Sequence, residues 1–270
     1  MTVPPILSVT EAQAFTAMRS FLLDNCIQTT GSLNPSNLPV DVFRGQAGTN
    51  QVPESGAPDF VVMSSLSQRR LSYNETTYVD DVLTGSITGS VLTVTALARQ
   101  QGPLVAGMTL TDGVWPTMNV APNTVIVSQL TGTPGGIGTY LVSPSQVLAA
   151  ETLYAGLRQD LVPTELTIQL DVHGPAAGDN SRIIDGLFRS EYGVDAFEAA
   201  LLAEGAPSYS VVPLNCDVRG QVPFWNEQSQ VEYRYVLEAR MQIDPVIATP
   251  QQFATEVEVR LIDAVTAYPT

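Results

Sequence analysis

The sequence contains no lysine, and its positive charge comes from 12 arginines set against 27 acidic residues, which leaves a formal net charge of -15. A basic footprint for nucleic acid is therefore absent, because phosphate contacts need clustered positive side chains. Two interpretations of the acidity stay open. It can simply keep the protein soluble, or it can line a channel through which DNA slides without sticking.

Histidine and cysteine are also scarce. The two cysteines, Cys26 and Cys216, are too few for a disulfide framework and predict buried thiols in a reducing compartment. The single histidine, His173, has Asp171 two residues away on the same strand face, but no nucleophile is identifiable beside them. One histidine and two distant cysteines cannot form a zinc site without carboxylates. We therefore predict no catalytic residue, no metal site and no cofactor, and we expect that the protein is not an enzyme.

Long hydrophobic runs are missing as well. No apolar stretch reaches the ~20 residues that a membrane helix needs, so we expect no membrane partner. The N-terminal residues MTVPPILSV lack the basic region and long apolar core of a signal peptide, which predicts synthesis in the cytosol. Apolar residues make up 44% of the chain and charged residues 14%, a composition typical of a folded protein.

The clearest structural pattern lies at residues 164–193. Leu166, Ile168, Leu170 and Val172 alternate with polar residues, which predicts a strand with one buried face. After Gly174-Pro175 the period becomes helical, with Ile183, Ile184, Leu187 and Phe188 on one stripe. We expect Gly178-Asp179-Asn180-Ser181 to cap this helix, in preference to forming a Ca²⁺ loop, and Gly193 to end it in a left-handed conformation.

The flanking sequence predicts a similar mixture of helices and strands. Ser8 and Glu11 have the spacing of a capping box before a helix whose apolar stripe is Ala14, Phe15, Met18, Phe21 and Leu22. A second helix is expected at 195–204, with Phe197, Leu201 and Leu202 as its apolar residues. Strands are expected at 40–44, 60–66, 209–214, 233–243 and 257–261. The predicted class is α+β, a mainly antiparallel sheet with helices packed on one face.

Residues 82–155 differ in composition, with Arg99, Asp112 and Glu151 as their only charges. Alternation around Gly89-Ser90 predicts a hairpin, and short strands follow between turns. We predict a small all-β barrel or sandwich inserted into a discontinuous core formed by residues 1–81 and 156–270. Two functions of this insertion stay equally open. It can be an outward-facing domain that binds a neighbour or a surface glycan, or a spacer that enlarges the ring.

Three segments carry a family resemblance. The first is LDVHGP followed by GDN and IIDGLFRSEYG, the second is VPFWNEQSQVEYRYVLEARMQIDP at 222–245, and the third is TPQQFATEVEVRLIDAVTAYP at 249–269. They resemble the tail-terminator or neck-terminator proteins of long-tailed bacteriophages. The resemblance implies a structural virion protein that forms a ring, commonly a hexamer. Such a ring would be assembled in the host cytoplasm, end the tail tube and join it to the head connector, with sheath proteins as further partners and DNA in the lumen.

Five residues are candidates for the interfaces of such a ring. Arg69 and Arg70 follow a predicted strand and either face solvent or contact an acidic neighbouring subunit. Phe224 and Trp225 are either core residues or interface anchors, and Arg234 lies on the polar face of a predicted strand. The alternative function is adhesion or carbohydrate binding by the β insertion, for which Trp115, Tyr140 and Tyr154 are the candidate exposed aromatics.

Overall fold

The structure, a computed structural model, describes residues 6–26, 41–45, 59–114, 118–174, 176–222, 224–225 and 231–253. The chain forms two compact units. One comprises residues 7–75 and 160–247, and the other comprises residues 1–6, 76–159 and 248–270. Each unit is described by itself below.

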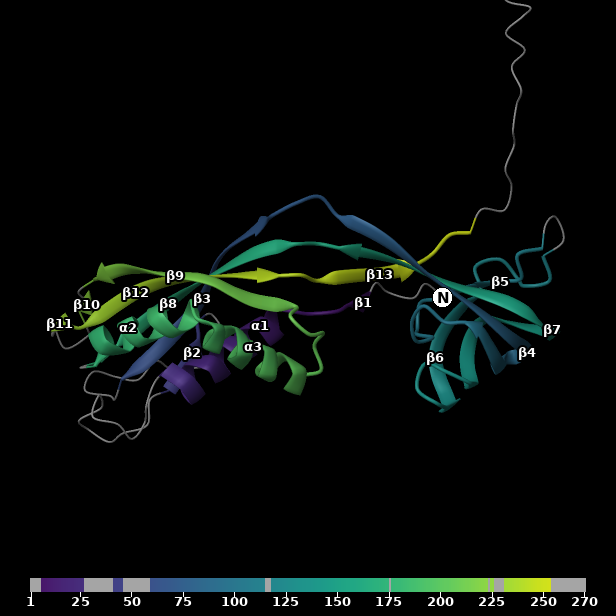
Figure 1. The fold of residues 1–270 in the computed structure, drawn as a ribbon, viewed down its shortest axis with the longest axis horizontal. Helices are drawn as coiled ribbons and strands as arrows, with labels where there is room; N and C mark the ends of the chain where they lie inside the picture. Colours follow the sequence, from purple (N-terminus) through teal and green to yellow (C-terminus); the bar gives the residue numbers. More distant parts are fainter. Residues whose placement is uncertain are drawn as a thin grey trace, which may run out of the picture. The chain divides into compact units, whose positions relative to one another are not determined.

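The first unit contains a five-stranded sheet with helices on one face (Figure 1). In spatial order its strands are β2 (Asp41–Arg44), β3 (Phe60–Arg70), β8 (Thr164–His173), β12 (Arg234–Ile243) and β9 (Val211–Gln221). All neighbours are antiparallel except β2 and β3. The helices are α1 (Glu11–Phe21), extended by the π-helical turn η1 (Leu22–Cys26), α2 (Ala177–Phe188) and α3 (Glu191–Ala203). This arrangement confirms the predicted α+β class.

The core of this unit lies between the helices and the sheet. The apolar row of β8, which is Leu166, Ile168, Leu170 and Val172, is fully buried there, as the alternation predicts. Phe21, Phe188 and Phe197 bring α1, α2 and α3 together, with ring centroids 5.4–5.8 Å apart. The predicted stripe of α1 is buried throughout. On α3, Phe197 and Leu201 are buried, whereas the Leu202 side chain is 54% exposed.

The start of α1 differs from the prediction by two residues. Thr10, and not Ser8, is the N-cap, and it forms a capping box with Gln13. The Ser8 hydroxyl instead accepts a hydrogen bond from the backbone N–H of Val246 at 2.8 Å. Spacing alone could not separate the two capping boxes, because both place a hydroxyl three residues before a carboxylate or amide.

The predicted cap of α2 is also wrong. Gly178 to Ser181 lie within the helix, and no side chain of its N-cap residue Ala176 caps it. The cap comes from elsewhere in the chain: the Asp59 carboxylate accepts from the Ala176 N–H at 2.8 Å. Asp59 is almost fully buried, and burial raises the pKa of its carboxyl, while hydrogen bonds from backbone amides partly offset the rise.

Gly193 is likewise not a left-handed cap, because it lies in the first turn of α3. A Cβ added at Gly193 would lie 2.6 Å from the Leu187 carbonyl oxygen and 3.1 Å from that of Phe188. The glycine is therefore needed for the close approach of α3 to the end of α2, and not for a positive φ.

Both cysteines are free and buried, Cys26 at the end of η1 and Cys216 on β9. Burial raises the pKa of Cys216 to about 12 and raises that of Cys26 further. Neither thiol ionises near neutral pH, so both act as small apolar core residues.

The second unit is built from β strands around its own core. Its strands are β4 (Glu75–Arg99), β5 (Thr109–Thr111), β6 (Val125–Gly132) and β7 (Gly138–Leu161), and β7 also pairs with β13 (Val246–Pro250), which pairs with β1 (Ile6–Leu7). The Thr95 hydroxyl donates to the Thr84 carbonyl at 3.2 Å and Gly89 has φ +66°, consistent with the predicted hairpin.

The buried residues of this unit form a cluster separate from the helix-covered core. It includes Leu83, Ile87, Leu92, Ile126 and Tyr140. A closed barrel or a sandwich, and the limits 82–155 for an inserted domain, remain predictions. A short ladder joins β10 (Phe224–Trp225) to β11 (Val231–Glu232). The strand predicted at 257–261 lies outside the described residues.

Candidate interface on the open face of the sheet

The five-stranded sheet has a second face, which no helix of the described residues covers (Figure 1). We call it the open face. Its polar side chains include Ser67 and Arg69 on β3, Glu165, Thr167, Gln169 and Asp171 on β8, Arg234, Glu238, Arg240 and Gln242 on β12, and Arg219 on β9. Polar and charged residues therefore follow one another across four adjacent strands. Phe60, Val62, His173 and Val236 lie on the same face.

Asp171 is the centre of one hydrogen-bonded group on the open face. Arg234 donates to its Oδ1 from Nη2 at 2.7 Å and from Nε at 3.1 Å, and Gln169 Nε2 lies 3.0 Å from both carboxylate oxygens. The side chains of Arg234 and Asp171 are only 25% and 12% exposed. This is a half-buried, charge-assisted contact, which is stronger than an ordinary surface ion pair.

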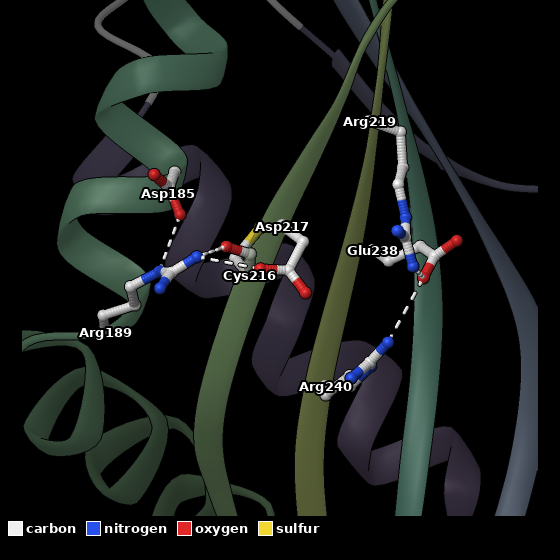
Figure 2. Close-up of polar contacts among 7 residues, drawn as sticks. All are labelled: Asp185, Arg189, Cys216, Asp217, Arg219, Glu238 and Arg240. Atoms are coloured by element: carbon white, nitrogen blue, oxygen red, sulfur yellow. Dashed lines mark hydrogen bonds and ion pairs between the residues drawn. The ribbon is translucent and has the colours of Figure 1, made fainter.

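Glu238 is the centre of a second group (Figure 2). Arg219 hydrogen-bonds its Oε2, and Arg240 Nη2 lies 3.6 Å from the same oxygen. The hydrogen bond from Arg219 lowers the pKa of the Glu238 carboxyl, with both arginine charges acting in the same direction, and the bond to Glu238 raises the pKa of Arg219. Arg219 reaches this position because it is the extra residue of a β-bulge, where Val236 pairs with Gly220 and Leu237 with Val218.

Arg189, at the C-cap of α2, hydrogen-bonds the edge strand β9 (Figure 2). It hydrogen-bonds Asp185 at 2.8 Å, the Cys216 carbonyl, and Asp217 at 3.1 Å. The bond to Asp185 and the charges of both carboxylates raise the pKa of Arg189. The guanidinium thus satisfies a carbonyl on the outer edge of β9.

His173 lies at the end of β8, in a packed environment. Its ring stacks on Phe60 with centroids 4.5 Å apart and an angle of 4° between the planes. Asp171 accepts hydrogen bonds from Arg234 and Gln169, so its carboxylate is held by these residues. The described residues include no group of three or more His, Cys, Asp or Glu side chains that could hold a metal ion.

The structure brings together some of the predicted interface residues and separates others. Arg69 and Arg234 share the open face, near opposite ends of β8, and Arg69 pairs with Glu165 at 3.2 Å. Arg70 points to the helix-covered side of the sheet and hydrogen-bonds Asn74. The backbones of Phe224 and Trp225 form β10, and their side chains lie outside the described part of the structure.

The sequence analysis missed Arg219, Glu238 and Arg240 as a group. The alternation of β12 already places Glu238 and Arg240 on one polar face, which was an available signal. Arg219 joins them only through the bulge, which no spacing rule predicts. Among the arginines that the structure describes, Arg69, Arg219, Arg234 and Arg240 thus lie on the open face, each beside a carboxylate.

The three aromatic candidates for the alternative function differ in how far they are exposed. Tyr140 is fully buried and donates its hydroxyl hydrogen bond to the Gly136 carbonyl, so its assignment as an exposed aromatic is wrong. Tyr154 is 38% exposed, and Trp115 lies outside the described residues. None of the described helices is long and apolar enough to cross a membrane.

The chain was compared with models of known protein families. The family model described as phage neck terminator protein matches residues 125–265, just over half of the chain, including β8, β9 and β12. A search of curated proteins found no match. The matched region contains most of the open face and both helices that follow β8.

Proposed function

Because the chain belongs to the phage neck terminator family, we propose that copies of it form a ring, a hexamer by the family resemblance, that ends the tail tube and joins it to the head connector. Membership of this family indicates a structural role at the tail–neck region of a virion. The match over residues 125–265 is the observation that carries the proposal. No catalytic activity and no cofactor are part of it.

The open face supplies a surface suited to contacts within such an assembly. Its arginines are held beside carboxylates, so the face presents planar guanidinium donors with little excess charge. Arginine is enriched at protein interfaces, whereas isolated surface ion pairs add little to the stability of a single chain. We therefore assign the paired arginines to docking on other subunits or on tail-tube and sheath proteins.

The proposed lumen passes DNA without binding it. With 12 arginines against 27 carboxylates, and several arginines already paired, the chain offers few free contacts for phosphate. In a titration at ~50 mM salt, duplex DNA should show negligible binding. Tight binding would contradict a lumen of this kind.

Assembly tests the proposal. Purified protein alone, and mixed with tail tubes from particles that lack it, would be examined by light scattering and negative-stain microscopy. We expect rings, alone or on tube ends. The double variant Arg219→Glu/Arg240→Glu should weaken them, while Arg182→Glu on α2, exposed and away from the open face, should not. A protein that stays monomeric and leaves tube ends bare would contradict the proposal.

A further inference from the structure

Strand β3 is paired on both sides for only part of its length. On one side β8 pairs with it from Phe60 to Arg70, but on the other side β2 pairs only with Phe60 to Met63. Gly45 N donates to Met63 O at 2.7 Å, the last bond on that side within the described residues. Residues Ser65 to Arg70 are all exposed, so a row of backbone donors and acceptors faces outward there.

The opposite edge of the sheet is protected in three ways. Arg189 binds the Cys216 carbonyl, Pro213 removes a donor, and two bulges interrupt the pairing of β9 with β12. Residues 65–70, which we call the distal part of β3, have one bulge, at Leu66. No other described strand covers this part of the edge. Of the two edges, the one at β3 is therefore the one that the described residues leave open to another strand.

The exposed edge has two different faces. Arg69 lies on the open face, 70% exposed even though it pairs with Glu165. Arg70 lies on the helix-covered side together with Gln68, which hydrogen-bonds Glu11. A strand that added here would need acidic residues on the face that meets Arg69.

A segment of this chain has that pattern. In residues 256–261, Glu256, Glu258 and Arg260 alternate with Val257, Val259 and Leu261. A strand that extends a sheet with one face on a core places its apolar row on the core side. Glu256 and Glu258 would then lie on the same face as Arg69.

We infer that the distal edge of β3 receives the C-terminal segment, residues 254–270, of a neighbouring copy as an added antiparallel or parallel strand. The inference rests on the proposed ring and names its subunit contact. An edge on one copy and a segment on the next form a head-to-tail interface, which gives a ring when the rotation between successive copies closes. Backbone hydrogen bonds would provide affinity, and the Arg69–glutamate contact would select the orientation.

Charge exchange in the full-length protein tests this contact. The variants are Arg69→Glu, Glu256→Arg/Glu258→Arg, and the combination of both, compared by light scattering and native mass spectrometry over a range of concentrations. Each separate change should weaken assembly about tenfold, because it places like charges opposite each other, and the combination should restore most of the loss. Arg70→Glu is the matched control on the opposite face and should have the smaller effect.

Amide hydrogen exchange separates a contact between copies from one within a copy. Amides 65–70 should be protected in the assembled protein and exchange rapidly in the diluted monomer. Protection in the monomer would show that the edge is covered within one chain, for example by residues 46–58, and would overturn the inference. If the wild type assembles but the losses of affinity in the two separate charge variants add up in the combined variant, the inference is overturned and the proposed ring stands. A wild type that never assembles would overturn both.

Discussion

Arg234 binds Asp171 diagonally across the sheet, and not the residue that lies opposite it. In the register of β12 and β8, Arg234 pairs with His173, and Val236 pairs with Asp171. The guanidinium nevertheless reaches Asp171 Oδ1 at 2.7 Å, because a long side chain can contact diagonal neighbours on one sheet face. The His173 ring stacks on Phe60.

Removing Arg234 should therefore destabilise the helix-covered unit. Arg234→Ala removes the charged partner of the largely buried Asp171 carboxylate and leaves its contact with Gln169, which should cost about 1–3 kcal/mol of unfolding free energy. Urea unfolding followed by circular dichroism measures the change. The control Arg182→Ala, 84% exposed on α2, should stay within about 0.5 kcal/mol. Equal effects would show that the pair contributes no more than a surface contact.

Asp59 should make stability depend on pH. Because burial raises the pKa of its carboxyl above the ordinary 3.8, the native state retains a proton that the unfolded chain releases. The stabilising contribution is full below 3.8 and is lost as the pH rises through the raised value. Asp59→Asn keeps an acceptor for the Ala176 N–H but does not titrate.

The unfolding free energy of Asp59→Asn relative to wild type should therefore increase between about pH 4 and pH 7. Urea unfolding at several pH values tests the trend, and Asp179→Asn on the exposed surface gives the general effect of removing one negative charge. A difference that stays constant, or that shifts toward the wild type as the pH rises, would contradict burial as the dominant influence.

Hydrophobic period was enough to predict the sheet and the helices, but not the contacts between distant segments. The buried rows of β8 and α1 follow directly from spacing at two and at 3.6 residues. The cap of α2 could not be predicted, because Asp59 lies 117 residues from Ala176. The contact between Arg219 and Glu238 depends on a β-bulge. Alternation of apolar and polar residues indicates which face of a strand is buried, but it does not indicate where a bulge shifts the register.

Replacement by alanine should change the stability of the protein in opposite directions at Gly186 and Gly193. Gly193→Ala places a Cβ 2.6 Å from the Leu187 carbonyl oxygen, so α3 must shift, at a cost of about 1–3 kcal/mol. Gly186, within α2, has no atom within 4 Å of an added Cβ, and Gly186→Ala should stabilise the protein by about 0.5–1 kcal/mol. Thermal or urea unfolding measures the change in stability of each variant. Destabilisation by both changes would point to helix backbone effects, not to the α2–α3 approach.

The interval 82–155 should be removable. The two buried clusters share no residue, and a Gly/Ser linker in place of the interval adds only a few kcal/mol of loop closure, by a rough estimate. The remaining protein should keep a cooperative transition in near-ultraviolet circular dichroism. Loss of that transition would mean that the interval contributes to the helix-covered core and that the predicted boundaries are wrong.

The most direct test of the central claim is a reconstruction of the phage particle by electron cryomicroscopy, focused on the junction of tail and head. The account predicts a ring of density at the end of the tail tube into which copies of the five-stranded sheet with α1, α2 and α3 fit, around an axial channel. Finding this protein elsewhere in the particle, or finding a different protein in that ring, would contradict the account.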